Sequence, residues 1–387
     1  MNFTVHIFSV ISSCVVIHLI MIRFSASAQT DPGFRGSSSQ KVPSTYFNTG
    51  MNSYGYPFQE NFTSLKNDQS ADRNEEDTSQ QKALRMYLHE WIHKKKFTKE
   101  QNELMNLLRK ETLLYLQSIP NLSKSGADKL DNALFFSRFC IARDWKEEDA
   151  RQMLRNHLMW RKSIGLDEPI NTYHNANTRF YNDLIPRHNN LKMLRSLFPC
   201  WFHKIGKEGN PIYYCRIGKL NAQDLFKHVP LETFRDFFIL QQEATIQYRL
   251  PAASLQTGQL VTQSVYVIDL DGLTLKSFNN DMRQLLQKIS AVGDQHYPET
   301  MSSIIVVNTP FIFRVIWAFL APILPERVKA YVFFYGNRSK YLPELLKFID
   351  RDALPEFLGG DDILMYSGGQ RNVEIGPWAE HMPELLS

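Results

Sequence analysis

Apolar residues recur at helical spacing in the part of the chain that follows residue 80. Leu84, Leu88 and Ile92 fall on one face of a helix, and Leu104 and Leu108 share a face further along. The spacing predicts helices over residues 81–116, over 130–142 and from 146 to a stop at Gly165. Residues 81–170 are therefore predicted to form a small all-helical module.

From residue 171 onward, short apolar runs alternate with amphipathic helices. The predicted strands are residues 211–217, 264–270, 303–308 and 328–335, and the predicted helices between them are 231–250 and 275–291. Strands that are apolar almost throughout are typical of parallel sheets buried on both faces. We therefore predict an α/β domain over residues 171–370, with a mixed, largely parallel sheet.

The two ends of the chain differ from this middle part. Residues 3–22 are almost all apolar, and Ala-Ser-Ala at 26–28 resembles a cleavage site, so residues 1–28 are predicted to be a signal or a membrane anchor. No Lys or Arg precedes the apolar run, which weakens the secretory role, and cytoplasmic and secretory locations both stay open. Residues 29–80, rich in Ser, Asn, Gly, Asp and Gln, are predicted to be a disordered linker, and 371–387 a tail.

Composition narrows the functional classes. Hydrophobic residues make up 43% of the chain, and 44 basic against 40 acidic residues give a net charge of only +4. This balance indicates no nucleic-acid partner, although local basic patches can still meet anionic membranes. The four cysteines form no CxxC pair, so we expect neither a metal site nor a disulfide framework. The sequence has no Walker A, GxGxxG or GxSxG motif, and no cofactor is expected.

One motif points to zinc chemistry. His89-Glu90-Trp91-Ile92-His93 matches HExxH, which on a helix puts two imidazoles on one face with Glu90 as general base, and Glu111 is the candidate third ligand. The motif lies at the entry to the helical module, however, and three lysines at 94–96 follow it. We favour a solvated helix and keep a zinc hydrolase at His89 and His93 as an alternative.

A second motif points to phosphatase chemistry. Asp269-Leu270-Asp271-Gly272 follows an apolar strand, as in the DxDGT motif in which the first Asp attacks phosphorus, and Asp361-Asp362 would be the magnesium pair. Leu273 stands where the Thr belongs, and the motif lies deep in the chain. We favour the end of a strand followed by a turn, and keep a phosphatase at Asp269 and Asp271 as an alternative.

The run at residues 311–324 is apolar on every side of its predicted helix, with Arg314 almost alone as a charge. A helix of this kind is buried, lies in a membrane, or covers an apolar cavity. The pattern alone favours buried core and leaves the other two roles open.

Several further motifs, in sequence order, carry a family resemblance. They are Ser137-Arg138-Phe139-Cys140-Ile141-Ala142-Arg143 with Trp160-Arg161; the strand region 206–220; Val267-Ile268-Asp269-Leu270-Asp271-Gly272; Tyr297-Pro298-Glu299 with Asn308-Thr309-Pro310 and Pro322-Ile323-Leu324; and Leu354-Pro355-Glu356-Phe357-Leu358-Gly359-Gly360. Each is weak alone, but together they span residues 130–362. The chain resembles the CRAL-TRIO lipid-transfer family, and within it the yeast-type phosphatidylinositol-transfer proteins.

The resemblance implies a sheet that floors a hydrophobic lipid pocket and a helical gate, residues 311–324, that closes over it. The implied pocket and gate residues are Phe311, Phe313, Val315, Trp317, Phe319 and Leu320. The implied function is binding, and transfer between membranes, of a phospholipid or other hydrophobic ligand by a monomer that is not an enzyme. A membrane adaptor that transfers no lipid is the alternative within the same fold.

The resemblance also implies contacts with the lipid head group. Arg143 and Glu299 match positions that hold phosphatidylinositol in the family, and Ser264 matches one linked to phosphatidylcholine, with Tyr266 where a Thr is usual. Asp144, Val328 and Tyr331 stand where the inositol-binding members carry a basic residue, a Thr and a Lys. The head group is therefore left open. The alternative role of Arg143 and Glu299 is an internal ion pair between the helical module and the main domain.

Overall fold

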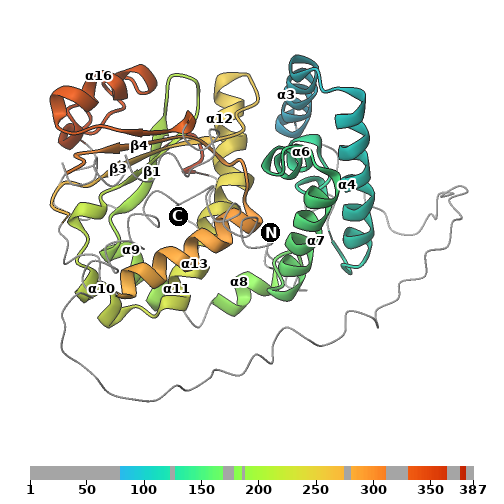
Figure 1. The fold of residues 1–387 in the computed structure, drawn as a ribbon, viewed down its shortest axis with the longest axis horizontal. Coiled ribbons are helices and arrows are strands. Elements are labelled where there is room, and N and C mark those ends of the chain that lie inside the picture. The colour runs from blue at the N-terminus through green and yellow to red at the C-terminus, as the bar shows by residue number, and fades with distance from the viewer. Residues whose placement is uncertain are drawn as a thin grey trace, which may run out of the picture.

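The structure is a computed structural model that describes residues 79–122, 127–168, 178–184, 188–273, 280–310, 330–363 and 375–380. The predicted signal or anchor at 1–28, almost all of the linker at 29–80 and the predicted gate at 311–324 lie outside these residues. In Figure 1 a helical module at the right stands beside a sheet that carries helices on both faces. The expected α/β fold with a preceding helical module is confirmed.

The helical module consists of α3 (Ser79–Lys95), α4 (Lys99–Gln117), α6 (Ala133–Ala142) and α7 (Glu147–Ser163). Leu108, Phe139 and Leu154 are buried at its centre. One continuous helix over 81–116 was the wrong prediction, because Lys96 adopts a left-handed backbone and Thr98 caps a new helix. The Thr98 side chain accepts a hydrogen bond from the Gln101 N–H, and the Gln101 side chain accepts one from the Thr98 N–H.

The sheet has five strands in the order β1-β2-β3-β4-β5. Their bounds are Cys200–Ile205 (β1), Pro211–Cys215 (β2), Ser264–Asp269 (β3), Met301–Val307 (β4) and Val332–Phe334 (β5). β1 pairs with β2 antiparallel, and the other neighbours are parallel. The prediction of a mixed, largely parallel sheet is therefore confirmed, while the edge strand β1 was not predicted because its sequence mixes apolar and polar residues.

The antiparallel register also places Cys200 opposite Cys215, and the two form a disulfide. No disulfide framework was expected from the sequence, and the described part of the chain has this single bridge. The sequence spacing of the two cysteines does not reveal it, because only the register of β1 on β2 brings them together.

Both faces of the sheet are covered, as a parallel sheet requires. One face packs against α9 (His188–Leu197), α10 (Ala222–His228), α11 (Leu231–Ala244) and α13 (Asn280–His296). The opposite face packs against α16 (Arg338–Phe348) and the 3-10 helix η7 (Glu356–Leu358). Figure 1 shows these two layers above and below the strands. The short helix α8 (Arg179–Leu184) lies near α7.

The helix that begins with α11 does not end at Leu250, as its pattern predicted. It continues through a π-helical turn, η4 (Thr245–Arg249), into α12 (Leu250–Thr257). Pro251 has no N–H to donate and its ring clashes with the carbonyl four residues back, which normally breaks a helix. The widened π turn absorbs this mismatch directly before the proline, so the helix goes on to Gly258.

A matched pair of substitutions on α4 tests the core of the helical module. Leu108 is 0% exposed and Leu114 is 62% exposed on the same helix. We expect Leu108→Ala to lower the free energy of unfolding by about 2–5 kcal/mol, because it leaves a cavity. Leu114→Ala should change it by less than about 0.5 kcal/mol. Urea unfolding measures both, and equal losses in the two variants would show that α4 packs by another face.

Candidate functional site

A row of large side chains crosses the sheet on the face that packs against α11 and α13. Phe202, Tyr213 and Tyr266 are register partners on β1, β2 and β3, and Ile304 and Val332 continue the row on β4 and β5. The ring centroids lie 4.9 Å apart for Phe202 and Tyr213 and 4.8 Å apart for Tyr213 and Tyr266. The row gives this face an aromatic half and an aliphatic half.

Ser264 lies two residues before Tyr266, at the start of β3. Its register partner, Met301, packs into the core on the α11 side of the sheet. The residue is 0% exposed, and its hydroxyl has no hydrogen-bond partner among the residues that the structure describes. A buried hydroxyl normally has a partner. Ser264 therefore offers an unused donor and acceptor beside the aromatic row, in the place predicted for head-group contact.

Arg249 adds a buried positive charge to this row. Its guanidinium stacks over the Phe202 ring at 4.1 Å and donates hydrogen bonds to the Gln241 carbonyl oxygen and to Oγ1 of Thr245. It is 0% exposed. No sequence signal singles this residue out, because residues 241–249 also hold three Gln, a Glu, a Thr and a Tyr.

The C-terminal segment 375–380 closes the same edge of the sheet. Ile375 forms a bridge with His203 on β1, and Trp378 is 0% exposed with its ring edge-on to Phe202, at 6.4 Å between centroids. Gly376 is required beneath the indole, because a Cβ atom there would collide with the Trp378 ring. Part of the predicted tail 371–387 is therefore packed structure, which the sequence analysis did not predict.

Glu299 lies in the turn between α13 and β4, with a left-handed backbone at φ 56°. The turn approaches Ser264, because the Ser264 N–H donates to the Thr300 carbonyl oxygen. Glu299 also acts electrostatically on Arg138 of α6, whose pKa burial lowers to about 10 while Glu299 opposes the shift. Arg143 ends α6, and its side chain donates to the neighbouring Ala142 carbonyl oxygen. The structure thus brings Ser264, Tyr266 and the Glu299 turn together.

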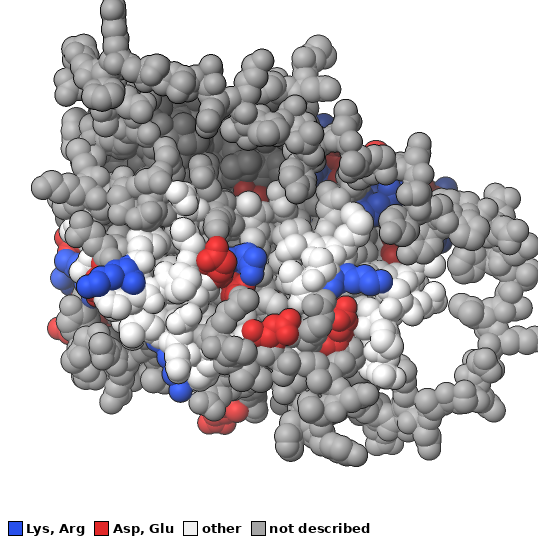
Figure 2. Space-filling view, turned by 90° about the horizontal axis from the view of Figure 1, so that it is seen from below, with Lys and Arg blue, Asp and Glu red and all other residues white. Residues whose placement is uncertain are grey.

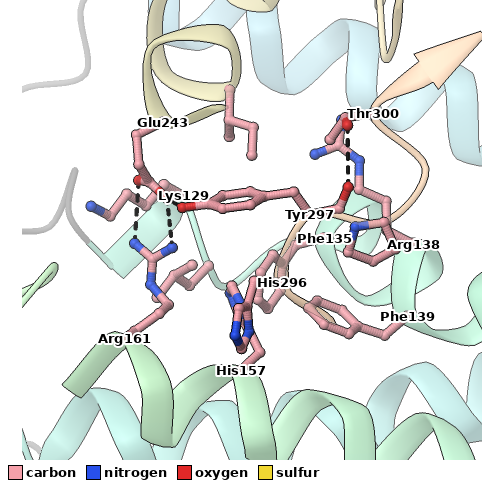
Figure 3. Close-up of a pocket in the computed structure, with 13 residues that line it drawn as sticks. Lys129, Phe135, Arg138, Phe139, His157, Arg161, Glu243, His296, Tyr297 and Thr300 are labelled. Atoms are coloured by element: carbon pink, nitrogen blue, oxygen red, sulfur yellow. Dashed lines mark hydrogen bonds and ion pairs between the residues drawn. The ribbon is translucent and has the colours of Figure 1, made fainter. Parts of the chain in front are cut away.

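A buried network of charges joins the helical module to the sheet domain (Figure 3). Arg161 of α7 donates to Asp167 at 2.6 Å and to Glu243 of α11 at 2.8 Å. Lys129 contacts Asp167 at 3.1 Å. Burial raises the pKa of Glu243, but Arg161 and Lys129 outweigh it and hold that pKa below its ordinary value. Both carboxyl groups are therefore ionised, and the two cations cancel them.

Beside this network lies a cavity of about 20 Å³ between α6, α7 and the Glu299 turn. It has room for water but not for an acyl chain. His157 and His296 line it, and the His296 ring stacks on Trp160 at 3.8 Å. His157 is 1% exposed, and neither of its ring nitrogens has a hydrogen-bond partner among the described residues. Figure 3 shows the two imidazoles side by side.

The contacts of the candidate catalytic and metal-binding residues do not favour either enzymatic alternative. Glu111, the candidate third zinc ligand, is bonded to Arg151 and Arg155. The Asp269 carboxylate caps its own turn, accepting from the Asp271 N–H and from the side-chain amide of Asn308. Within the described ranges, no three His, Cys, Asp or Glu side chains are placed to hold a metal ion.

The implied gate residues Phe311, Phe313, Val315, Trp317, Phe319 and Leu320 lie outside the described residues. The same holds for residues 3–22. In the part of the chain that is described, no helix combines the length and the apolar character needed to cross a membrane.

The buried histidines predict how stability depends on pH. Burial, followed by the nearby Arg161 charge, lowers the pKa of His296 to about 4 and that of His157 well below 6.5, with Asp167 opposing the shift of His157. Histidines in the unfolded chain titrate near about 6.5. Below that pH the unfolded chain binds protons that the folded chain does not. The contribution of these two histidines to the free energy of unfolding is therefore fully present at neutral pH. It falls between about pH 6.5 and 4, by about 1.4 kcal/mol per pH unit for each histidine.

Urea unfolding at pH 7, 6 and 5 measures this slope. We expect a shallower slope for His157→Phe, whose ring fits the surrounding aromatic side chains. A slope in His157→Phe as steep as in the wild type would contradict the prediction.

Comparison with known proteins agrees with this geometry. Residues 195–360 match the model of the CRAL/TRIO domain. A SEC14 cytosolic factor of Eremothecium gossypii is 30% identical over 259 residues, which are 66% of this chain and 79% of that protein. A phosphatidylinositol/phosphatidylcholine transfer protein of Arabidopsis thaliana, SFH7, is 30% identical over 67% of this chain. The chain spans less than half the length of that plant relative, 44%.

Among solved structures, the chain aligns with the crystal structure of Sfh5 over 69% of this chain and 90% of that one, at 15% identity and a TM-score of 0.45. The family resemblance drawn from the motifs is confirmed by the domain match and by the fungal relative. The chain therefore belongs to the CRAL/TRIO family, and its relatives are Sec14-type phosphatidylinositol/phosphatidylcholine transfer proteins.

Proposed function

We propose that this protein binds one phospholipid on the α11–α13 side of its sheet and transfers it between membranes. The observation that carries the proposal is the buried Ser264 hydroxyl beside the aromatic row, because it is a polar group left for a ligand to satisfy. A lipid site needs mostly apolar walls and a few placed polar groups. The plant relative is named a phosphatidylinositol/phosphatidylcholine transfer protein, and this name supports the same ligand class.

Two sets of polar residues are proposed for the lipid site. Ser264 and Tyr266 lie on the sheet floor and suit a choline phospholipid by the family resemblance, while Glu299 and Arg143 suit the inositol head group. The turn that carries Glu299 is bonded to the Ser264 backbone. Both head groups are therefore proposed ligands. We favour the choline phospholipid, because the Ser264 hydroxyl has no hydrogen-bond partner among the described residues.

Residues 311–324 are the proposed gate, on the strength of their apolar sequence and the resemblance. Figure 2 views the molecule from below Figure 1, and on the described part of this face acidic and basic side chains are interspersed rather than gathered in a patch of one sign. Electrostatic attraction over the described part of that face is accordingly weak. We propose that the membrane is met by the apolar gate, and that no catalytic step is involved.

A matched pair of serines tests the lipid site. The wild-type chain should co-purify with phospholipid, detected by mass spectrometry of extracted lipid. Ser264→Ala removes a hydroxyl that has no partner among the described residues, so we expect unchanged melting but roughly three- to tenfold weaker phosphatidylcholine uptake, the value of about one hydrogen bond.

The control is Ser254→Ala. That hydroxyl donates to the Leu250 carbonyl oxygen and accepts from the Val261 N–H, and it is 1% exposed. We expect this variant to lose about 1–3 kcal/mol of stability and to keep lipid uptake. A well-folded wild type that carries no lipid and takes none from vesicles would overturn the proposed function. Lipid uptake without transfer would favour the adaptor.

The gate has its own test. We expect Trp317→Asp and Phe319→Asp to reduce vesicle transfer strongly while changing thermal melting little, because a gate residue meets the bilayer only in the open form. A core aromatic would behave differently, since truncating one costs about 3–5 kcal/mol and a buried unpaired charge costs more. Transfer rate and melting are measured on the same proteins. Large losses of stability in both variants would make this helix ordinary core.

A further inference from the structure

The Glu299 turn is held in an unusual conformation. Glu299 has φ 56°, in the left-handed region that residues other than glycine rarely adopt. Such a conformation persists only where the surrounding contacts fix it. Contacts made by the neighbouring residues on both sides hold this turn.

Tyr297 fixes the start of the turn and Thr300 fixes its end. Tyr297 is 3% exposed, and its hydroxyl donates to Oε1 of Glu243 at 2.9 Å. The Thr300 hydroxyl donates back to the Tyr297 carbonyl oxygen at 3.2 Å, and the Thr300 carbonyl accepts from the Ser264 N–H at 2.9 Å. Figure 3 shows Tyr297 reaching from this turn to Glu243, with Arg161 beyond it.

Glu243 in turn is held from the helical module. Arg161 of α7 binds Glu243 and Asp167 together, and the hydroxyl of Tyr115 on α4 donates to Asp167 at 2.9 Å. A continuous chain of buried contacts thus runs from Arg161 of α7 through Glu243 of α11 to the turn. Tyr115 lies outside this chain, because its hydroxyl contacts Asp167 and not Glu243. Water does not compete for the bonds at the centre of the network, because the residues there are each 3% exposed or less: Arg161, Asp167, Glu243 and Tyr297.

We infer that Tyr297 is a positioning residue: through Glu243 and Arg161 it transmits the placement of the helical module to Glu299, and so sets which head group the protein prefers. This inference rests on the proposed function. Tyr297 itself is not assigned a contact with the lipid. Its ring also packs at 5.9 Å from Trp160 and 6.2 Å from His157, so a purely structural role has to be separated from a positioning role.

Two Tyr→Phe variants in the same network make that separation. Tyr297→Phe and Tyr115→Phe each remove one hydroxyl that donates to a buried carboxylate at 2.9 Å, but only Tyr297 belongs to the turn. The full-length chain is incubated with vesicles containing equal phosphatidylinositol and phosphatidylcholine, and the ratio of the two bound lipids is measured by mass spectrometry. A lost core contact lowers melting temperature in both variants without moving this ratio.

We expect Tyr297→Phe to change the ratio at least fivefold and Tyr115→Phe to leave it within twofold, with similar falls in melting temperature. If Tyr297 acts through Glu299, then Tyr297→Phe in a Glu299→Gln background should add less than a further 1.5-fold, because the two changes then remove the same effect. Gln247→Met, which removes a 2.7 Å hydrogen bond to Oε2 of Glu243, serves as a second variant and should move the ratio in the same direction.

The outcomes separate the inference from the proposed function. Wild-type protein that takes up no phospholipid overturns the proposed function, and the inference with it. Normal uptake with a ratio that Tyr297→Phe and Gln247→Met leave unchanged overturns the inference alone. The inference also fails if Tyr115→Phe shifts the ratio equally, if Glu299→Gln has no effect on it, or if the effects of Tyr297→Phe and Glu299→Gln multiply.

Discussion

The contact that binds the helical module to the sheet domain is a set of four charges, Arg161 and Lys129 against Asp167 and Glu243, all of them buried except the partly exposed Lys129. Charges removed from water are costly unless they are paired and hydrogen-bonded, and removing one partner typically costs about 3–5 kcal/mol because it leaves the other unpaired. Here the charges sum to zero, and tyrosine hydroxyls occupy further acceptor sites. The module and the domain are therefore coupled: neither can lose the other without leaving ions unpaired in an apolar interior.

The two faces of the sheet carry different side chains. The face under α16 is closed core, in which Tyr214, Val267 and Ile305 are fully packed. The opposite face carries the aromatic row with an unused hydroxyl at Ser264 and a buried cation at Arg249. An apolar surface with few polar groups suits an amphipathic ligand, because burial contributes about 25 cal/mol per Å² for the acyl part while the polar groups orient the head.

The sequence predicted the features that depend on local pattern: the helices, the apolar strands and the family motifs. It did not predict features that arise from pairing between distant segments. The Cys200–Cys215 bridge depends on strand register, and the burial of Trp378 depends on a segment docking onto β1. Ser264, Tyr266 and Glu299 were singled out by resemblance alone; only the tertiary structure shows that the Ser264 hydroxyl lacks a partner among the described residues. Arg138 was given no role from the sequence, because its electrostatic interaction with Glu299 joins two segments far apart in the chain.

A lipid carrier has to keep its specificity while it opens. Opening at the end that holds the Glu299 turn would disturb ion pairs and hydrogen bonds that depend on fixed geometry, at 2.6–2.9 Å. Apolar contacts are non-directional, and a membrane can replace them with contacts of nearly equal value. A membrane shifts the balance between closed and open forms only by interacting more favourably with one form than with the other. In the proposed carrier, the rigid polar end and an apolar wall that parts from it are thus complementary requirements, and the charge network would confine the proposed movement to the apolar side.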